Sequence, residues 1–249
     1  MEKILIIGAT SAMARETARL YAREGAAFLL AARDPKKLSA LAAELRKLGA
    51  TKTVCFPLDV NRRQRHSLLL QKIKALGGAD VALIAHATPV FPGPIEKNPD
   101  LLPPEVETNF TGTLLLLLRL AAWFEQQGRG TIAVLTSVAG DRGRRDQYVY
   151  AACKAGVTVF LQGLRQRLRP AGVAVVTIKP GLTDTPLTAA LPKNPLYARP
   201  AAVARGIRRA IRAKAVEAYV PWFWRYIMWG ITFLPESWLP SASGKRHAA

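Results

Sequence analysis

The chain has 249 residues, 50% of them hydrophobic, which is enough to bury a substantial core in one or two domains. Its 18 glycines and 17 prolines are too few for a disordered or fibrous chain, and its two cysteines show neither metal-ligand spacing nor a disulfide framework. The net charge of +19 favours phosphorylated ligands, nucleic acid or an anionic membrane surface, with an arginine-rich solvated surface as the alternative.

Apolar runs and amphipathic helical segments alternate along the chain. The opening MEKILIIGAT enters an apolar run at once and leaves no room for a secretory signal, so we expect a cytoplasmic protein. The predicted strands are residues 3–9, 27–32, 53–60, 80–88, 131–138 and 173–181. The predicted helices are residues 12–26, 35–49, 63–78, 105–128 and 148–172. Strands without two-residue alternation indicate a single α/β domain with a Rossmann-like, doubly wound parallel sheet, whose ligands bind beyond the carboxyl ends of the strands.

The first strand-to-helix turn, GATSAMA, is built of small residues. Such a turn points backbone N–H groups and a helix N-terminus at a phosphate. Only Gly8 of the expected glycines is present, because Ala12 and Ala14 stand in the other two places. An ordinary tight turn is therefore the alternative to a dinucleotide site. The expected cofactor contacts in this turn are Gly8, Thr10, Ser11, Ala12 and Met13.

The second strand is followed by Arg33 and Asp34. In dinucleotide folds a carboxylate near this point accepts the ribose 2′-hydroxyl of NAD, whereas an arginine accommodates the 2′-phosphate of NADP. Arg33 favours NADP. Asp34 leaves NAD open, although it could equally cap the helix that follows.

Two tyrosines and a lysine open the helix predicted over 148–172. Tyr150 and Lys154 are four residues apart and share one helix face, whereas Tyr148 points roughly to the opposite side. Tyrosine titrates near 10, too high for proton exchange at neutral pH, and an adjacent ammonium group favours the phenolate. Ser137, at the carboxyl end of the preceding strand, can hold a substrate oxygen beside Tyr150. The pattern therefore favours Tyr150 over Tyr148 as the tyrosine whose pKa could approach the working range.

With these motifs in place, the sequence resembles the short-chain dehydrogenase/reductase family over at least residues 3–190. The resemblance is carried by Ser137, Tyr150 and Lys154, by Asn109 in ETNFTGT, and by KPGLTDTP at 179–186. It implies that Tyr150 exchanges the proton, that Lys154 holds the nicotinamide ribose and lowers the tyrosine pKa, and that Ser137 positions the substrate oxygen. Asn109 is implied to support a water that leads to Lys154.

The same resemblance implies a nicotinamide dinucleotide cofactor, and together with Arg33 it favours NADP over NAD. Beyond the first turn, the implied cofactor contacts are Asp59 and Val60 at the adenine, Ala85 after the fourth strand, and Pro180, Gly181 and Thr183 at the nicotinamide. One motif departs from the family, because its usual Asn-Asn-Ala-Gly appears as IAHA from Ile84 to Ala87. The altered motif and the two missing glycines leave one alternative open, a non-catalytic, membrane-associated protein on the same fold that binds NAD(P).

A narrower resemblance points to the reductase component of decaprenylphosphoryl-ribose 2′-epimerase and its bacterial relatives, which reduce a keto-pentose on a polyprenyl phosphate. It is carried by SVAGDRGRRDQYVYAACKAG and by WFWRYIMWGITFLP. Arg142, Arg144 and Arg145 could then meet a substrate phosphate, with a solvated basic loop as the alternative. The expected substrate is a small or lipid-linked ketone or alcohol. No nucleic-acid motif accompanies the arginines, so no nucleic-acid partner is expected, nor is a metal site.

The residues after the dehydrogenase pattern form a C-terminal amphipathic and aromatic extension of the same domain. The expected organisation is a catalytic part over 1–198, a basic helix and aromatic segment over 199–240, and a disordered tail over 241–249. The aromatic part is too short to cross a bilayer. It can lie on the inner face of an anionic membrane or close over the substrate pocket, and a homo-oligomer, a dimer or a tetramer, is also expected.

Overall fold

The fold is a seven-stranded sheet in which every neighbouring pair of strands is parallel. The computed structural model describes residues 1–88, 92–189 and 193–238. The strand order is β3-β2-β1-β4-β5-β6-β7, so the winding reverses between β1 and β4. The strands are β1 Lys3–Ile7, β2 Ala27–Ala32, β3 Lys52–Pro57, β4 Val81–Ile84, β5 Gly130–Leu135, β6 Val173–Pro180 and β7 Glu217–Val220. This is the doubly wound sheet that the sequence predicts.

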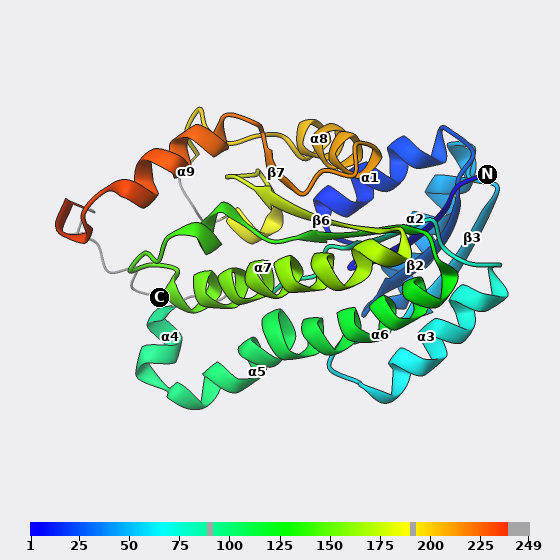
Figure 1. Cartoon of the computed structure of the whole chain (residues 1–249), viewed down its shortest axis with the longest axis horizontal. Helices are drawn as coiled ribbons and strands as arrows, with labels where there is room; N and C mark the ends of the chain where they lie inside the picture. Colours follow the sequence, from blue (N-terminus) through cyan, green and yellow to red (C-terminus); the bar gives the residue numbers. More distant parts are fainter. Residues whose placement is uncertain (89–91, 190–192, 239–249) are drawn as a thin grey trace.

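Helices cover both faces of the sheet, because alternate residues of each strand point to opposite sides (Figure 1). In β1, Ile4 and Ile6 pack against one helical layer, and Leu5 and Ile7 pack against the other. The first layer contains α1 Ala12–Ala22, α2 Pro35–Lys47 and α8 Pro200–Arg212. The second contains α3 Gln64–Ala75, α6 Gly112–Gln127 and α7 Tyr148–Leu168.

The helix predicted over 105–128 forms, but it contains a wider turn that periodicity does not reveal. It consists of α5 Leu102–Val106, a single π-helical turn η2 Glu107–Thr111, and α6. Such turns occur frequently at functional sites, and this one contains the buried Asn109. The leucine-rich part of this helix lies in α6, where Leu116, Leu117 and Leu120 are buried.

The residues expected as a C-terminal extension include a core helix and a strand that was not predicted. The apolar side of α8, which includes Val203 and Ile207, packs in the same core cluster as β1 and α1. Two arginines of this helix, Arg208 and Arg212, form ion pairs with Glu24, which lies just after α1. β7 then completes the sheet edge beside β6. Four residues are too short a run to be recognised as a strand from sequence.

The aromatic segment forms α9 Trp224–Phe233, which follows the carboxyl end of β7. Figure 1 shows α9 projecting from the same end of the domain as α4 Pro92–Lys97. Within the described residues, no helix is long and apolar enough to cross a membrane. The expected tail over 241–249 lies outside those residues. The short 3₁₀ turns are η1 Pro99–Leu101, η3 Val138–Asp141, η4 Arg169–Ala171, η5 Pro186–Thr188 and η6 Glu236–Trp238.

Candidate active site

The first strand-to-helix turn has a backbone shape suited to a phosphate. Gly8 has a φ of +78°, and a Cβ at this position would lie 2.4 Å from the backbone nitrogen of His86, so only glycine fits. The Ser11 side chain caps α1 by accepting from the Ala14 N–H at 3.3 Å. The first-turn N–H groups of Ala12 and Met13 precede the intrahelical hydrogen bonds and are left for an anion. The turn therefore fits a pyrophosphate although two of the expected glycines are alanines.

The two residues at the end of β2 that could contact the ribose, Arg33 and Asp34, have different surroundings. Asp34 is the N-cap of α2, and its Oδ1 accepts from the N–H groups of Lys36 at 2.9 Å and Lys37 at 3.1 Å. The Lys37 N–H contributes most to lowering the pKa of this carboxyl group. Arg33 is exposed beside it. The capping alternative for Asp34 is thus the one that the structure adopts.

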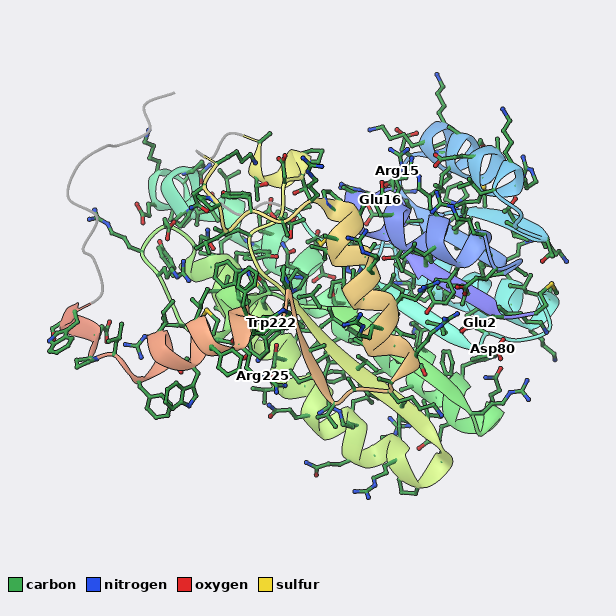
Figure 2. The ribbon with its side chains drawn as sticks, turned by 90° about the horizontal axis from the view of Figure 1, so that it is seen from above. Glu2, Arg15, Glu16, Asp80, Trp222 and Arg225 are labelled. Carbon is green, nitrogen blue, oxygen red and sulfur yellow. The ribbon has the colours of Figure 1, made fainter. Side chains whose placement is uncertain are left out.

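Arg15 lies close to the same corner, and the sequence had not singled it out. A hollow of about 120 Å³ between the first turn and α2 is lined by Thr10, Arg15, Lys37 and three further residues of α2. Arg15 also forms an ion pair with Glu44 at 3.3 Å. Figure 2 shows Arg15 on α1, well away from Trp222 and Arg225 at the start of α9.

The loop after β3 is held in place from two sides. Asp59 accepts a hydrogen bond from the Asn61 N–H at 3.0 Å, which closes a tight turn. The Val60 carbonyl lies 2.8 Å from Nε2 of the buried His66, so this imidazole nitrogen donates to it. Asp59 and Val60 therefore lie at the same sheet edge as Gly8, two strands away.

Ser137, Tyr150 and Lys154 come together beyond the carboxyl end of β5. Ser137 caps η3, where its Oγ accepts from the Ala139 N–H at 3.1 Å, and it forms a hydrogen bond with Tyr150. Lys154 Nζ lies 5.5 Å from the centroid of the Tyr150 ring. It also donates to the Leu135 carbonyl at 3.4 Å. Tyr148 points elsewhere and donates to Glu96 at 3.0 Å, as its helical position predicts.

Burial shifts both titrating groups of this cluster toward their neutral forms. It raises the pKa of Tyr150 to about 12, against a smaller lowering by the Ser137 hydrogen bond. It lowers the pKa of Lys154, only 4% exposed, to about 8. Both groups therefore respond strongly to any new charge that enters the site.

Gly140 sets the distance between the serine loop and the helix of Tyr150. A Cβ on Gly140 would lie 2.9 Å from Ala155 N and from the Lys154 carbonyl carbon, so η3 and α7 touch backbone to backbone. Gly143, in the same loop, has nothing within 4 Å.

A buried charge network ties this loop to the sheet edge. Lys179 Nζ forms ion pairs with Asp141 at 2.7 Å and Glu217 at 2.9 Å. The Tyr219 hydroxyl donates to Asp141 at 2.8 Å. The network joins η3 to β6 and β7, and it fixes the loop that begins at Ser137.

Asn109 is 1% exposed, and other side chains hold its amide in one orientation. Its Oδ1 accepts from the Thr88 N–H at 3.1 Å, and its Nδ2 donates to Thr88 Oγ1 at 2.8 Å. Thr88 in turn donates to Glu105 at 2.5 Å. Asn109 is therefore bound to the segment after β4, and the sequence had not identified Thr88 or Glu105 as its partners.

The segment after β6 contacts α9. A Cβ on Gly181 would lie 1.9 Å from Nε1 of Trp224, so the indole lies directly on the glycine. Pro180 is buried at the end of β6, and Thr183, also buried, donates to the Gly181 carbonyl at 3.0 Å. Helix α9 thus forms one wall of the region where the nicotinamide is expected. No His, Cys, Asp and Glu cluster suited to a metal ion occurs in the described parts of the chain.

The model of the short chain dehydrogenase family matches residues 2–196. The chain belongs to this family. Relatives named as oxidoreductases are 34% identical in Streptomyces coelicolor and 31% identical in Mycobacterium tuberculosis. The aligned regions cover 94% of this chain in both cases, and 92% and 94% of the respective relatives.

Solved structures agree with this assignment of the fold. A polyketide ketoreductase of actinorhodin synthesis, crystallised with NADPH, has a TM-score of 0.78 and 26% identity over 88% of this chain and 94% of its own. An alcohol dehydrogenase from Comamonas testosteroni has a TM-score of 0.79 and 22% identity over 98% and 97%, and it supports the fold alone. This short-chain dehydrogenase is therefore an oxidoreductase, of a family that uses nicotinamide dinucleotides.

We expect Gly140→Ala to push η3 away from α7, because the new methyl group meets backbone rather than a flexible side chain. The expected loss of stability is about 1–3 kcal/mol, typical of overpacking. Gly143→Ala is the matched control and should be neutral or slightly stabilising. Thermal unfolding of the two variants tests this. Equal melting temperatures would contradict the close contact.

Proposed function

We propose that this short-chain dehydrogenase reduces a ketone to a secondary alcohol with NADPH, and that Tyr150 supplies the proton. The observation that carries the proposal is the cluster of Ser137, Tyr150 and Lys154 beside the turn at Gly8. When bound, the nicotinamide supplies the hydride. The chain's own residues then have to hold the carbonyl oxygen and neutralise the charge that develops on it.

The cluster is suited to both tasks. The Ser137 Oγ accepts from a backbone N–H, and its hydroxyl hydrogen is directed at Tyr150. We propose that this hydrogen turns to the substrate oxygen when a ketone binds. Tyr150 donates its proton to the same oxygen and becomes a phenolate. The Lys154 ammonium beside the ring offsets the cost of that buried negative charge. Asn109 is proposed to hold a water through which Lys154 exchanges protons with solvent.

NADPH is proposed over NADH because of the charges around the adenosine end. The Asp34 carboxylate is occupied as the cap of α2, which leaves Arg33 to meet a 2′-phosphate. Arg15 and Lys37 add positive charge to the neighbouring hollow. The adenine contacts are proposed at Asp59, Val60 and Ala85, and the nicotinamide contacts at Pro180, Gly181 and Thr183.

The substrate is proposed to be apolar or lipid-linked and to enter beside α9. The inner face of α9, with Trp224 and Met228, packs against Val138 next to Ser137. Arg142 donates to the Leu234 carbonyl at 3.3 Å, which ties the basic loop to the end of this helix. A keto-pentose on a polyprenyl phosphate, with its phosphate near Arg142 and Arg144, is the most specific substrate that fits this arrangement.

The outer face of α9 is proposed to lie on an anionic lipid surface at the inner face of the membrane. Trp222 just before the helix, and Tyr226, Trp229 and Phe233 on it, follow helical spacing and are 65–74% exposed. The helix has 10 residues and is about 15 Å long, so it can lie in the headgroup region but not span the bilayer. The net charge of +19 adds attraction to anionic lipids.

Self-association is proposed through α6 and α7, which lie side by side on one face of the sheet (Figure 1). Leu118 and Val159 are exposed apolar residues on these two helices, 43% and 65% exposed. Light scattering of the purified protein distinguishes a dimer or tetramer from a monomer.

Replacing Tyr150 by phenylalanine should remove the proton donor and leave the cofactor cleft intact. We expect ketone reduction, measured by NADPH oxidation with a panel of ketones, to fall by roughly 10²–10⁴-fold. NADPH binding should change by less than about threefold. Tyr148→Phe, two residues away on the exposed side of the helix, is the control and should keep wild-type rates. Wild-type turnover by Tyr150→Phe would show that another group is the acid.

The rate should also depend on the charge of Lys154. Because burial lowers its pKa to about 8, the ammonium is present below this pH and lost above it. We expect kcat/KM for reduction to be flat below pH 8 and to fall about tenfold per pH unit above it. Lys154→Arg stays charged and should lose this decline, although its plateau is lower. A wild-type profile that stays flat to pH 10 would contradict the role of Lys154.

Membrane binding can be tested by co-sedimentation with vesicles that contain phosphatidylglycerol. The triple variant Trp222→Ser, Trp229→Ser and Phe233→Ser should lose at least about tenfold in partitioning, because it removes large apolar side chains from the lipid-facing stripe. Leu68→Ser, an exposed apolar residue of α3, is the control and should bind like the wild type. Equal binding by all three proteins would show that α9 does not contribute to membrane binding.

A further inference from the structure

His86 occupies the junction between the glycine turn and the Tyr150 helix. It follows Ala85 after β4, and its backbone nitrogen is the atom that a Cβ on Gly8 would strike. The imidazole also lies within electrostatic reach of Lys154. His86 is therefore at the point where the sheet reverses its winding.

Hydrogen bonds assign the tautomer of this histidine. His86 Nε2 lies 2.8 Å from the hydroxyl of Thr113, and that hydroxyl donates to the Thr108 carbonyl at 3.1 Å. A threonine hydroxyl has one hydrogen, so toward His86 it accepts. Nε2 consequently carries the imidazole proton, and Nδ1 is a bare acceptor.

Nδ1 is buried and has no hydrogen-bond partner among the residues described. A buried acceptor without a donor costs free energy, and such an atom calls for an explanation. Burial lowers the pKa of His86 to about 3, so the ring is neutral at physiological pH and can accept a hydrogen bond through Nδ1. The Lys154 ammonium donates instead to the Leu135 carbonyl.

The order of the strands indicates which part of a dinucleotide passes this atom. Along the edge of the sheet, the loops follow the order Asp59, Arg33, Gly8, His86 and Ser137, after β3, β2, β1, β4 and β5. Neighbouring strands are about 4.8 Å apart. A cofactor with its adenosine end near Arg33, its pyrophosphate at Gly8 and its reactive ring near Ser137 must place the intervening sugar at His86.

We propose that His86 Nδ1 accepts a hydrogen bond from a hydroxyl of the nicotinamide-side ribose, which makes His86 a further cofactor-binding residue of this enzyme. The inference rests on the proposed function, because it requires that a nicotinamide dinucleotide binds. A sugar hydroxyl supplies the donor that the buried nitrogen lacks, and it needs no charge on the imidazole.

A matched pair of variants separates the two ring nitrogens. His86→Asn places an amide oxygen near the position of Nδ1, and His86→Gln places its amide nitrogen near that of Nε2 and so keeps the contact to Thr113. In a fluorescence titration with NADPH, we expect the glutamine variant to bind roughly 3- to 10-fold more weakly and the asparagine variant to stay within about twofold of the wild type. Tyr21→Phe removes another buried, unpartnered polar atom, in the last turn of α1, and should change nothing.

Titration with adenosine 2′,5′-bisphosphate locates the contact, because this ligand lacks the nicotinamide ribose. His86→Gln should bind it like the wild type. An equal loss for both ligands, or wild-type NADPH affinity in His86→Gln, would overturn the inference. Wild-type protein that binds no NADPH would instead refute the proposed function, and the inference with it.

A double-mutant cycle with Lys154→Met distinguishes a direct contact from one made through the lysine. For a direct contact, His86→Gln still weakens NADPH binding in the Lys154→Met background, although the two losses need not multiply because both residues lie at one ribose. If His86 only orients Lys154, the glutamine variant costs nothing further in the methionine background, and the assignment of a ribose contact fails. Circular dichroism of each variant checks that the fold is retained.

Discussion

The burial of the Lys154 ammonium beside the Tyr150 ring is the constraint on which the rest of the site depends. A buried cation is unfavourable unless a nearby negative charge stabilises it. Here the neighbour is the Tyr150 phenol, which becomes a buried anion when it gives up its proton. Gly140 makes the arrangement possible, because its missing side chain lets the loop of Ser137 lie directly on the helix that carries both groups. The ion pairs of Lys179 then hold that loop against the sheet edge. A close backbone contact at Gly140 and the ion pairs of Lys179 together keep the three groups in one place.

Helix α9 bears on both alternatives that the sequence left open, because one of its faces is buried and the other is exposed. Trp224 and Met228 face inward, and the indole of Trp224 lies on Gly181, so the helix packs against the segment that follows β6. Trp229 and Phe233 stack edge to face on the exposed side, with ring centroids 5.3 Å apart. The inward packing is a feature of the fold. The outward stripe is what motivates a lipid surface, and a substrate that crosses from lipid to pocket would meet both faces of one short helix.

Much of this could be predicted from the sequence, because local chemistry decides it. Continuous apolar strands and capped amphipathic helices determine the doubly wound sheet, and the spacing of Tyr150 and Lys154 places both on one helix face. What could not be predicted depends on tertiary contacts. β7 is too short to have a pattern, α8 is recognisable as a core helix only through its packing on α1, and the π turn at Asn109 leaves no mark in the periodicity. His86 could be noticed as a departure from the family motif, but its bare Nδ1 follows only from its hydrogen bond to Thr113.

The central claim is that the end of the sheet beyond Gly8 and Tyr150 is a working NADPH site despite its altered motifs. A fluorescence titration of the wild-type protein with NADPH and, in parallel, with NADH tests it most directly. We expect NADPH to bind at least about tenfold more tightly than NADH, a difference of about 1.4 kcal/mol that one charged contact to the 2′-phosphate can provide. Binding of neither cofactor would contradict the account, because the altered turn would then have lost its function, and preferential binding of NADH would contradict the part assigned to Arg33.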